Sequence, residues 1–111
     1  MNLNSIFSDK LSEVIDNDNQ NQAFCCLKNC YELLLKNKDD IEVEKTAVDG
    51  RSLLYLNFLT RFKIYSEVGD YIECCHLLKD ILELCKITEG VINNMLYCLH
   101  EIDGKVVASY D

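Results

Sequence analysis

Cysteine and histidine are the side chains of this 111-residue chain with the widest range of possible chemistry. Zinc binds thiolate and imidazole ligands, and the best candidates for such ligands are Cys74, Cys75, His76, Cys98 and His100. A zinc site on helices usually pairs ligands three or four residues apart on one face, whereas neighbours in this set are adjacent or two apart and their side chains diverge. We therefore expect no metal and no other cofactor.

The cysteine pattern also argues against a disulfide framework. The chain has an odd number of cysteines, including two adjacent pairs, and only Cys26 and Cys30 have a helical spacing of four. The full set is Cys25, Cys26, Cys30, Cys74, Cys75, Cys85 and Cys98. Without an export signal we expect reduced thiols, which behave as small buried hydrophobic side chains.

Catalytic motifs are not evident. A nucleophilic cysteine needs a partly exposed, electropositive site with an imidazole beside it, and we expect His76 and His100 to lie at the surface or its boundary. The four glycines are isolated from one another, so they form no phosphate-binding loop. No pair of carboxylates stands out from the surface charge. We expect that the protein is not an enzyme.

Apolar residues recur at steps of three and four, which predicts five amphipathic helices. The expected ranges are about 3–15, 23–36, 51–67, 71–86 and 89–102. Such helices must cover one another's apolar stripes, so the prediction is a single all-α domain over residues 1–111, a bundle or a stack of hairpins. An acidic connecting segment spans about 37–50. Leu53, Leu56 and Leu59 broaden the apolar stripe of the 51–67 helix, so we expect that helix to be central.

The turn after residue 67 carries specific signals. Gly69 can take the left-handed conformation that ends a helix, and Asp70 can cap the next helix with Glu73 at the capping-box position. The segment 65–75 resembles the turn and second helix of a tetratricopeptide-type hairpin. The two Cys-Cys pairs, however, lie 49 residues apart, whereas such repeats have a period of 34.

Charge excludes some partners and favours others. Nineteen acidic residues against eleven basic ones give a net charge of −8, which repels nucleic acid and attracts a basic protein. The N-terminal residues lack the features of a secretory signal, and no apolar run approaches the length of a bilayer span. We expect a cytoplasmic protein that does not enter membranes.

Two acidic groups are candidate partner-binding sites. The first is a run of Asp39, Asp40, Glu42, Glu44 and Asp49, with a single basic residue among them. The second surrounds Tyr71 at a predicted helix junction and includes Glu67 and Asp70. An aromatic side chain ringed by acids is a plausible hot spot for a basic partner, although acids at a junction also serve as helix caps.

In size, acidity and helical character the chain resembles bacterial immunity proteins, in particular those of contact-dependent growth-inhibition systems. That resemblance implies a stoichiometric inhibitor of a basic toxin domain, often a ribonuclease, whose nucleic-acid site is covered by carboxylates. The alternative is a helical adaptor, in which a tetratricopeptide-like groove with Tyr55, Tyr65 or Tyr71 holds a peptide or helix. An inhibitor predicts an acidic, salt-sensitive surface, whereas an adaptor predicts an exposed apolar groove.

Overall fold

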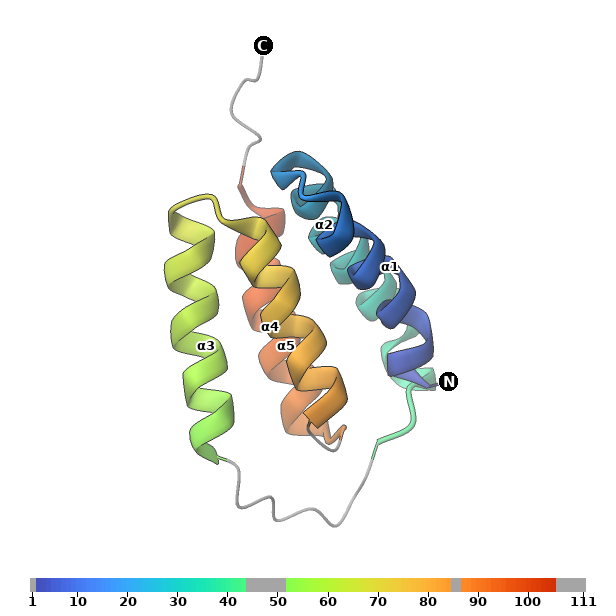
Figure 1. Cartoon of the computed structure of the whole chain (residues 1–111). Coiled ribbons are helices and arrows are strands. Elements are labelled where there is room, and N and C mark those ends of the chain that lie inside the picture. The colour runs from blue at the N-terminus through green and yellow to red at the C-terminus, as the bar shows by residue number, and fades with distance from the viewer. Residues whose placement is uncertain (1, 44–51, 85–86, 106–111) are drawn as a thin grey trace.

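The computed structural model describes residues 2–43, 52–84 and 87–105, and gives only the backbone for residue 4 and residues 52–55. This part of the chain forms the elements α1 (Leu3–Asn17), α2 (Gln20–Asn37), the short 3-10 turn η1 (Lys38–Asp40), α3 (Ser52–Glu67), α4 (Tyr71–Leu84) and α5 (Glu89–Asp103). The prediction of an all-α fold with five helices is confirmed (Figure 1).

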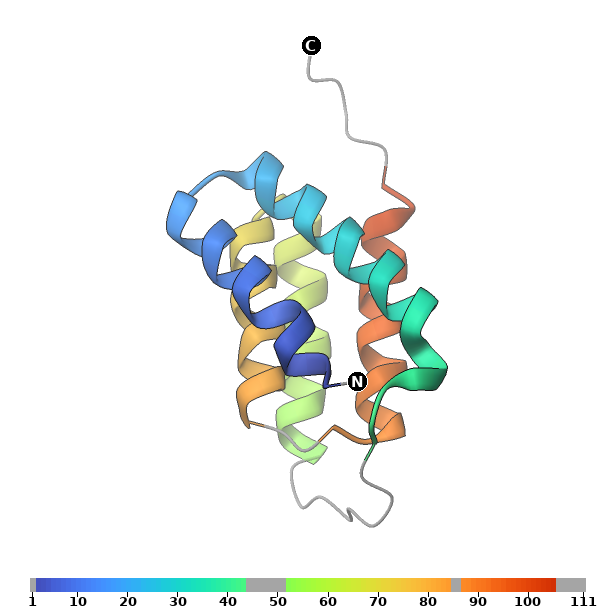
Figure 2. The same ribbon diagram turned by 90° about the vertical axis from the view of Figure 1, so that its right-hand side faces the viewer.

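The helices form three layers. The α1–α2 hairpin lies on one side of α4 and α5, and α3 lies alone on the other side (Figures 1 and 2). Helix α4 packs against α1, α2 and α3, while α5 packs against α2 and α3. The expectation that the third helix is central is therefore wrong, because α4 holds the central position and α3 forms an outer layer.

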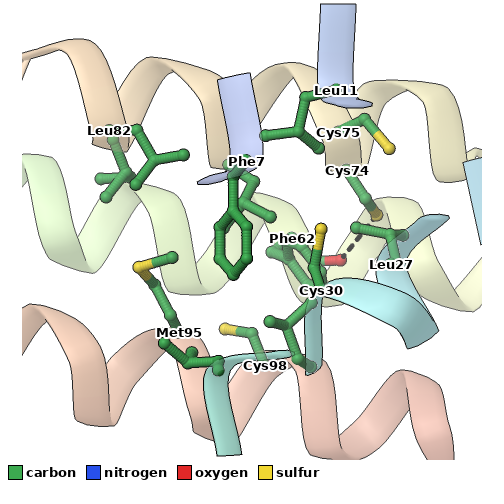
Figure 3. Packing of buried hydrophobic residues seen from close by; sticks show 14 of the residues in the cluster. Phe7, Leu11, Leu27, Cys30, Phe62, Cys74, Cys75, Leu82, Met95 and Cys98 are labelled. Atoms are coloured by element: carbon green, nitrogen blue, oxygen red, sulfur yellow. Dashed lines mark hydrogen bonds between the residues drawn. The ribbon is translucent and has the colours of Figure 1, made fainter. Parts of the chain in front are cut away.

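One hydrophobic core joins the layers. Side chains from the outer helices, including Phe7 of α1, Leu27 of α2 and Phe62 of α3, fill the space between α4 and α5 (Figure 3). Each of these three side chains is at most 2% exposed. Along α1 the buried positions Leu3, Phe7 and Leu11 recur every four residues, as the sequence pattern predicts.

Local capping sets the helix ends. Asn19 and Thr88 cap α2 and α5, because their side chains accept hydrogen bonds from the backbone N–H groups of Gln22 and Val91. Gly69 adopts φ +79°, and the Asp70 carboxylate accepts a bond from the Glu73 N–H at 3.3 Å. The predicted turn between α3 and α4 is thus confirmed.

The start of α2 is also tied to this turn. The side-chain amide of Gln20 donates to Asp70 Oδ1 at 3.1 Å, and its oxygen accepts from the Ile72 N–H at 3.0 Å. These bonds satisfy a backbone donor of the first turn of α4, which has no partner within the helix. The first residue of α2 therefore anchors the start of α4.

Helix α3 is less covered than its apolar content suggests. Leu56 is 60% exposed and Leu59 is partly buried, while the side chain of Leu53 lies outside the described residues. The expectation that these leucines widen a buried stripe is wrong for Leu56, because among the described helices α3 packs mainly against α4 and α5. None of the described helices is long and apolar enough to cross a bilayer.

Candidate protein-binding surface

The first predicted acidic site lies where α2 ends. Asp39 and Asp40 belong to η1, and Glu42 follows it; all three side chains are exposed. Glu44 and Asp49 lie outside the described residues. In both views, η1 lies at the opposite end of the molecule from the α3–α4 turn (Figures 1 and 2). The two predicted acidic groups are thus separate surfaces.

In the second predicted site, Tyr71 and Asp70 stabilise the fold, whereas Glu67 is exposed. Tyr71 is half-buried, and its ring meets that of Phe24 edge to face with centroids 4.8 Å apart. Asp70 is half-buried and caps α4 while it accepts from Gln20. Glu67 is exposed and lines a different feature, a groove beside α3. The junction therefore holds α3, α4 and α2 together, and Glu67 is the member available to a partner.

A groove with a volume of about 440 Å³ runs between α3 and α5. Its α3 wall consists of Leu59, Thr60, Phe62, Lys63, Ser66 and Glu67, and its other residues are Tyr97, Cys98, Glu101 and Lys105. The apolar part includes Phe62 and Cys98, which are nearly buried, while charged groups of both signs stand among the remaining residues. An apolar floor with a polar rim is the usual anatomy of a protein-binding site.

A hydrogen bond joins the last turn of α3 to Lys105, which lies just after α5 in the chain. The ammonium of Lys105 donates to the backbone carbonyl of Ser66 at 2.7 Å. A carbonyl in the last turn of a helix lacks a partner within that helix, and a cation there also interacts favourably with the helix dipole. Lys105 thus fixes the separation of α3 from the end of α5.

Other apolar side chains of α3, and of the turn after it, are exposed. Leu56 and Ile64 of α3 are 60% and 54% exposed, and Val68, in the turn that follows α3, is 72% exposed. Tyr97 of α5 is 67% exposed and lines the groove. We call the groove together with Leu56, Ile64 and Val68 the α3–α5 surface. A contiguous exposed patch of apolar side chains is typical of an interaction site.

The sequence did not single out this surface. Tyr97 lies off the apolar stripe of α5. An aromatic residue on an otherwise polar helix face is the sequence feature that could have indicated a binding surface here. Of the tyrosines expected in a groove, Tyr65 and Tyr71 pack against the core, and the side chain of Tyr55 lies outside the described residues. The aromatic residue that the groove presents is Tyr97.

The thiols and imidazoles are not arranged as a metal centre. In residues 2–43, 52–84 and 87–105, no three histidine, cysteine or acidic side chains are grouped so that they could hold a metal ion. His100 is exposed, and its Nδ1 is 2.9 Å from the Tyr31 hydroxyl, while His76 is half-buried. The positions expected for both histidines, at the surface or its boundary, are confirmed.

Most described cysteines are buried, as expected. Burial raises the pKa of both Cys74 and Cys98 to about 12. Cys25 is an exception because its side chain is exposed, and Cys85 lies outside the described residues. The expectation of buried thiols is therefore wrong for Cys25.

No family model, curated protein or solved structure matches this chain. The function must therefore be argued from the surface itself. Its two components are the apolar α3–α5 surface, with Glu67 and Glu101 beside it, and the exposed acids at η1.

Proposed function

We propose that this protein acts by binding another protein at the α3–α5 surface, as an immunity-type inhibitor of a basic toxin domain. The observation that supports the proposal most directly is the groove between α3 and α5 that presents the exposed ring of Tyr97. Burial of a leucine or isoleucine side chain contributes about 1.5–3 kcal/mol. The exposed parts of Leu56, Ile64, Val68 and Tyr97 would add apolar area to the proposed interface.

Tyr97 is the expected anchor of the complex. Tyrosine is enriched among the few residues that dominate binding energy, because it offers a large rigid ring and a polar end. Its position in the groove allows the ring to contact a partner side chain that enters between α3 and α5. Glu67 and Glu101 lie close enough to the same groove to pair with lysine or arginine around that contact.

The molecular charge supports a basic partner. A net charge of −8 accelerates the approach of a positively charged domain and disfavours acidic competitors. The exposed carboxylates of Asp39, Asp40 and Glu42 add to this attraction from the other end of the molecule. In the proposed complex the apolar surface contributes most of the binding free energy, and the acids increase the association rate.

The proposed mechanism is occlusion. A nuclease domain binds phosphates with lysine and arginine, and carboxylates placed on those cations would take the place of the phosphates. The inhibitor then needs no catalytic residue or cofactor, and one copy neutralises one toxin. We place this activity in the cytoplasm, where a nuclease toxin meets its nucleic-acid substrate.

A capture experiment tests the proposal. The tagged protein is incubated with a lysate of the source organism and with the product of the neighbouring upstream gene, and bound proteins are eluted at low and then high salt. We expect a basic toxin domain in equal stoichiometry, with its killing activity suppressed. Reversal of the charges at Asp39, Asp40 and Glu42 to lysine should slow association about tenfold and change dissociation little.

The second candidate function is a helical adaptor, which the groove itself favours. An adaptor would hold an apolar helix or peptide between α3 and α5, with contacts that resist salt. Capture of a non-toxic partner that stays bound in high salt would support the adaptor and contradict the inhibitor. Capture of a toxin domain whose killing activity the protein suppresses would do the reverse.

A further inference from the structure

The two rims of the α3–α5 groove carry charged side chains at matching heights. Helices α3 and α5 lie side by side and run in the same direction (Figures 1 and 2). At the end of the groove that the Lys105–Ser66 hydrogen bond marks, Glu67 lies on the α3 rim and Lys105 on the α5 rim. About one helical turn earlier, Lys63 lies on the α3 rim and Glu101 on the α5 rim. Each of these turns therefore offers one acid and one base, and their order reverses from one turn to the next.

The remaining turn of the groove carries no charge. Tyr97, four residues before Glu101, is 67% exposed on the α5 rim, and Thr60, three residues before Lys63, is exposed on the α3 rim. The floor between the rims includes Phe62, which is 2% exposed. The groove thus has an aromatic, uncharged end and a charged end.

The rim charges are available to a partner. Among the described residues, no ion pair engages Lys63, Glu67 or Glu101. Lys105 donates one hydrogen bond to Ser66, and an ammonium group has three donors. The two lysines and two glutamates cancel, whereas the whole chain has a net charge of −8. Two copies of this acidic chain repel each other less at a face without net charge.

We propose that the α3–α5 groove binds a second copy of this chain, in a dimer whose two-fold axis runs along the groove. Such an axis places the α3 rim of one copy against the α5 rim of the other at the same height. Lys63 then meets Glu101 of the second copy, and Glu67 meets Lys105 of the second copy. Symmetry forms each of these pairs twice, and the Tyr97 ring packs over the uncharged end of the second groove.

A two-fold axis across the groove is a less complete arrangement. Centred between the two charged turns, it pairs Lys63 with Glu67 of the second copy and Glu101 with Lys105 of the second copy. It also carries Tyr97 past the end of the second groove, so the exposed ring stays in water. The axis along the groove pairs the same charges and covers the ring as well.

The dimer and the proposed toxin complex use one surface, so they exclude each other. The dimer would then store the inhibitor until a toxin displaces the second copy. That role rests on the proposed function, whereas the dimer itself rests on the groove alone. The dimer is therefore tested without a toxin, and a negative result leaves the capture experiment to decide the proposed function.

Sedimentation equilibrium of the purified full chain tests the dimer. A thiol reductant is present because Cys25 is exposed and could link two copies covalently. Between about 10 μM and about 1 mM we expect the molar mass to rise from that of one chain towards twice that value. The mass of a single chain, 12.8 kDa, throughout this range would overturn the proposal.

Charge variants identify the face. In a dimer of identical copies, Lys63→Glu and Glu101→Lys each place like charges opposite one another, so each should raise the dissociation constant at least about tenfold. Lys38→Glu is the matched control, because it makes the same charge change at an exposed lysine of η1. It should dimerise nearly as the wild type does. Equal weakening by Lys63→Glu and Lys38→Glu would contradict the proposed face.

Mixing the two rim variants tests the arrangement of the copies. When Lys63→Glu and Glu101→Lys copies meet, the substituted side chains face each other with opposite charges, and the unchanged Glu101 and Lys63 form the second pair. The mixed dimer should bind about as tightly as the wild type. A mixture of Lys38→Glu with Glu101→Lys has the same total charge and should bind more weakly. If the two mixtures bind equally, the copies do not pair rim to rim along the groove and the proposal is wrong.

Discussion

At the scale of single residues, burial of Cys74 and Cys98 disfavours the charged thiolate form of each side chain. Cys74 is fully buried and its sulfur lies 3.8 Å from the Phe62 carbonyl oxygen, while Cys98 is 5% exposed on the floor of the α3–α5 groove. Burial raises the pKa of each thiol from 9.0 to about 12. The folded protein therefore keeps protons that the unfolded chain releases in alkaline solution.

This difference predicts alkaline destabilisation. Above pH 9 the unfolded chain binds fewer protons than the folded chain, so the free energy of unfolding falls as pH rises from about 9 towards 12. We expect each thiol to contribute a loss on the order of 1 kcal/mol by pH 10.5. Urea unfolding at pH 8 and pH 10.5 measures the loss. Cys74→Ala should lose less than the wild type, and an equal loss would contradict the assignment.

At the scale of the elements, the α3–α4 turn depends on one backbone conformation. Gly69 has φ +79°, and an added Cβ there would meet no atom within 4 Å. The cost of a side chain at this position is therefore conformational rather than steric.

Gly69→Ala should lower the free energy of unfolding by about 1 kcal/mol. Gly90→Ala is the matched control, because Gly90 lies in α5 and its Cβ would be 3.7 Å from Thr88 Oγ1, an ordinary contact. That change should be neutral or stabilise the protein by up to about 1 kcal/mol. Equal effects of the two substitutions in urea unfolding would count against the role of the turn.

Helix identity was largely predictable from the sequence, but helix placement was not. The caps at Asp70 and Thr88 are local signals, and the spacing of Phe7 and Leu11 marks a single face. Helix α3 is apolar on several sides, and such a sequence does not say which side a neighbour covers. The exposure of Leu56 is decided by the other helices, so only the folded chain shows it.

The same limit applied to the candidate site. Net charge is a sum over residues and needs no structure, so the sequence alone predicts a preference for a basic partner. The groove is a product of tertiary structure, because α3 and α5 are distant in sequence and Lys105 fixes their spacing through Ser66. Glu67 was identified as an acidic neighbour of Tyr71, but the structure places it in the wall of a groove that presents Tyr97.

At the scale of the whole molecule, the described helices cover the two sides of α4 and α5 unequally. The α1–α2 hairpin covers one side of α4 and α5, while a single helix covers the other (Figure 2). The exposed apolar row of α3 lies on this less covered side, and the acids at η1 lie at the far end. In the proposed complex, the overall charge attracts a basic partner and a distinct apolar surface holds it.

The central claim is that the α3–α5 surface binds the partner. The most direct test measures the dissociation constant of the captured partner for the wild type, for the combined Ile64→Ser and Tyr97→Ala variant, and for Leu35→Ser. Leu35 is the matched control, an exposed leucine on α2. We predict that the combined variant loses at least about 30-fold in affinity, while Leu35→Ser binds as the wild type does. Unchanged affinity of a folded combined variant would contradict the account.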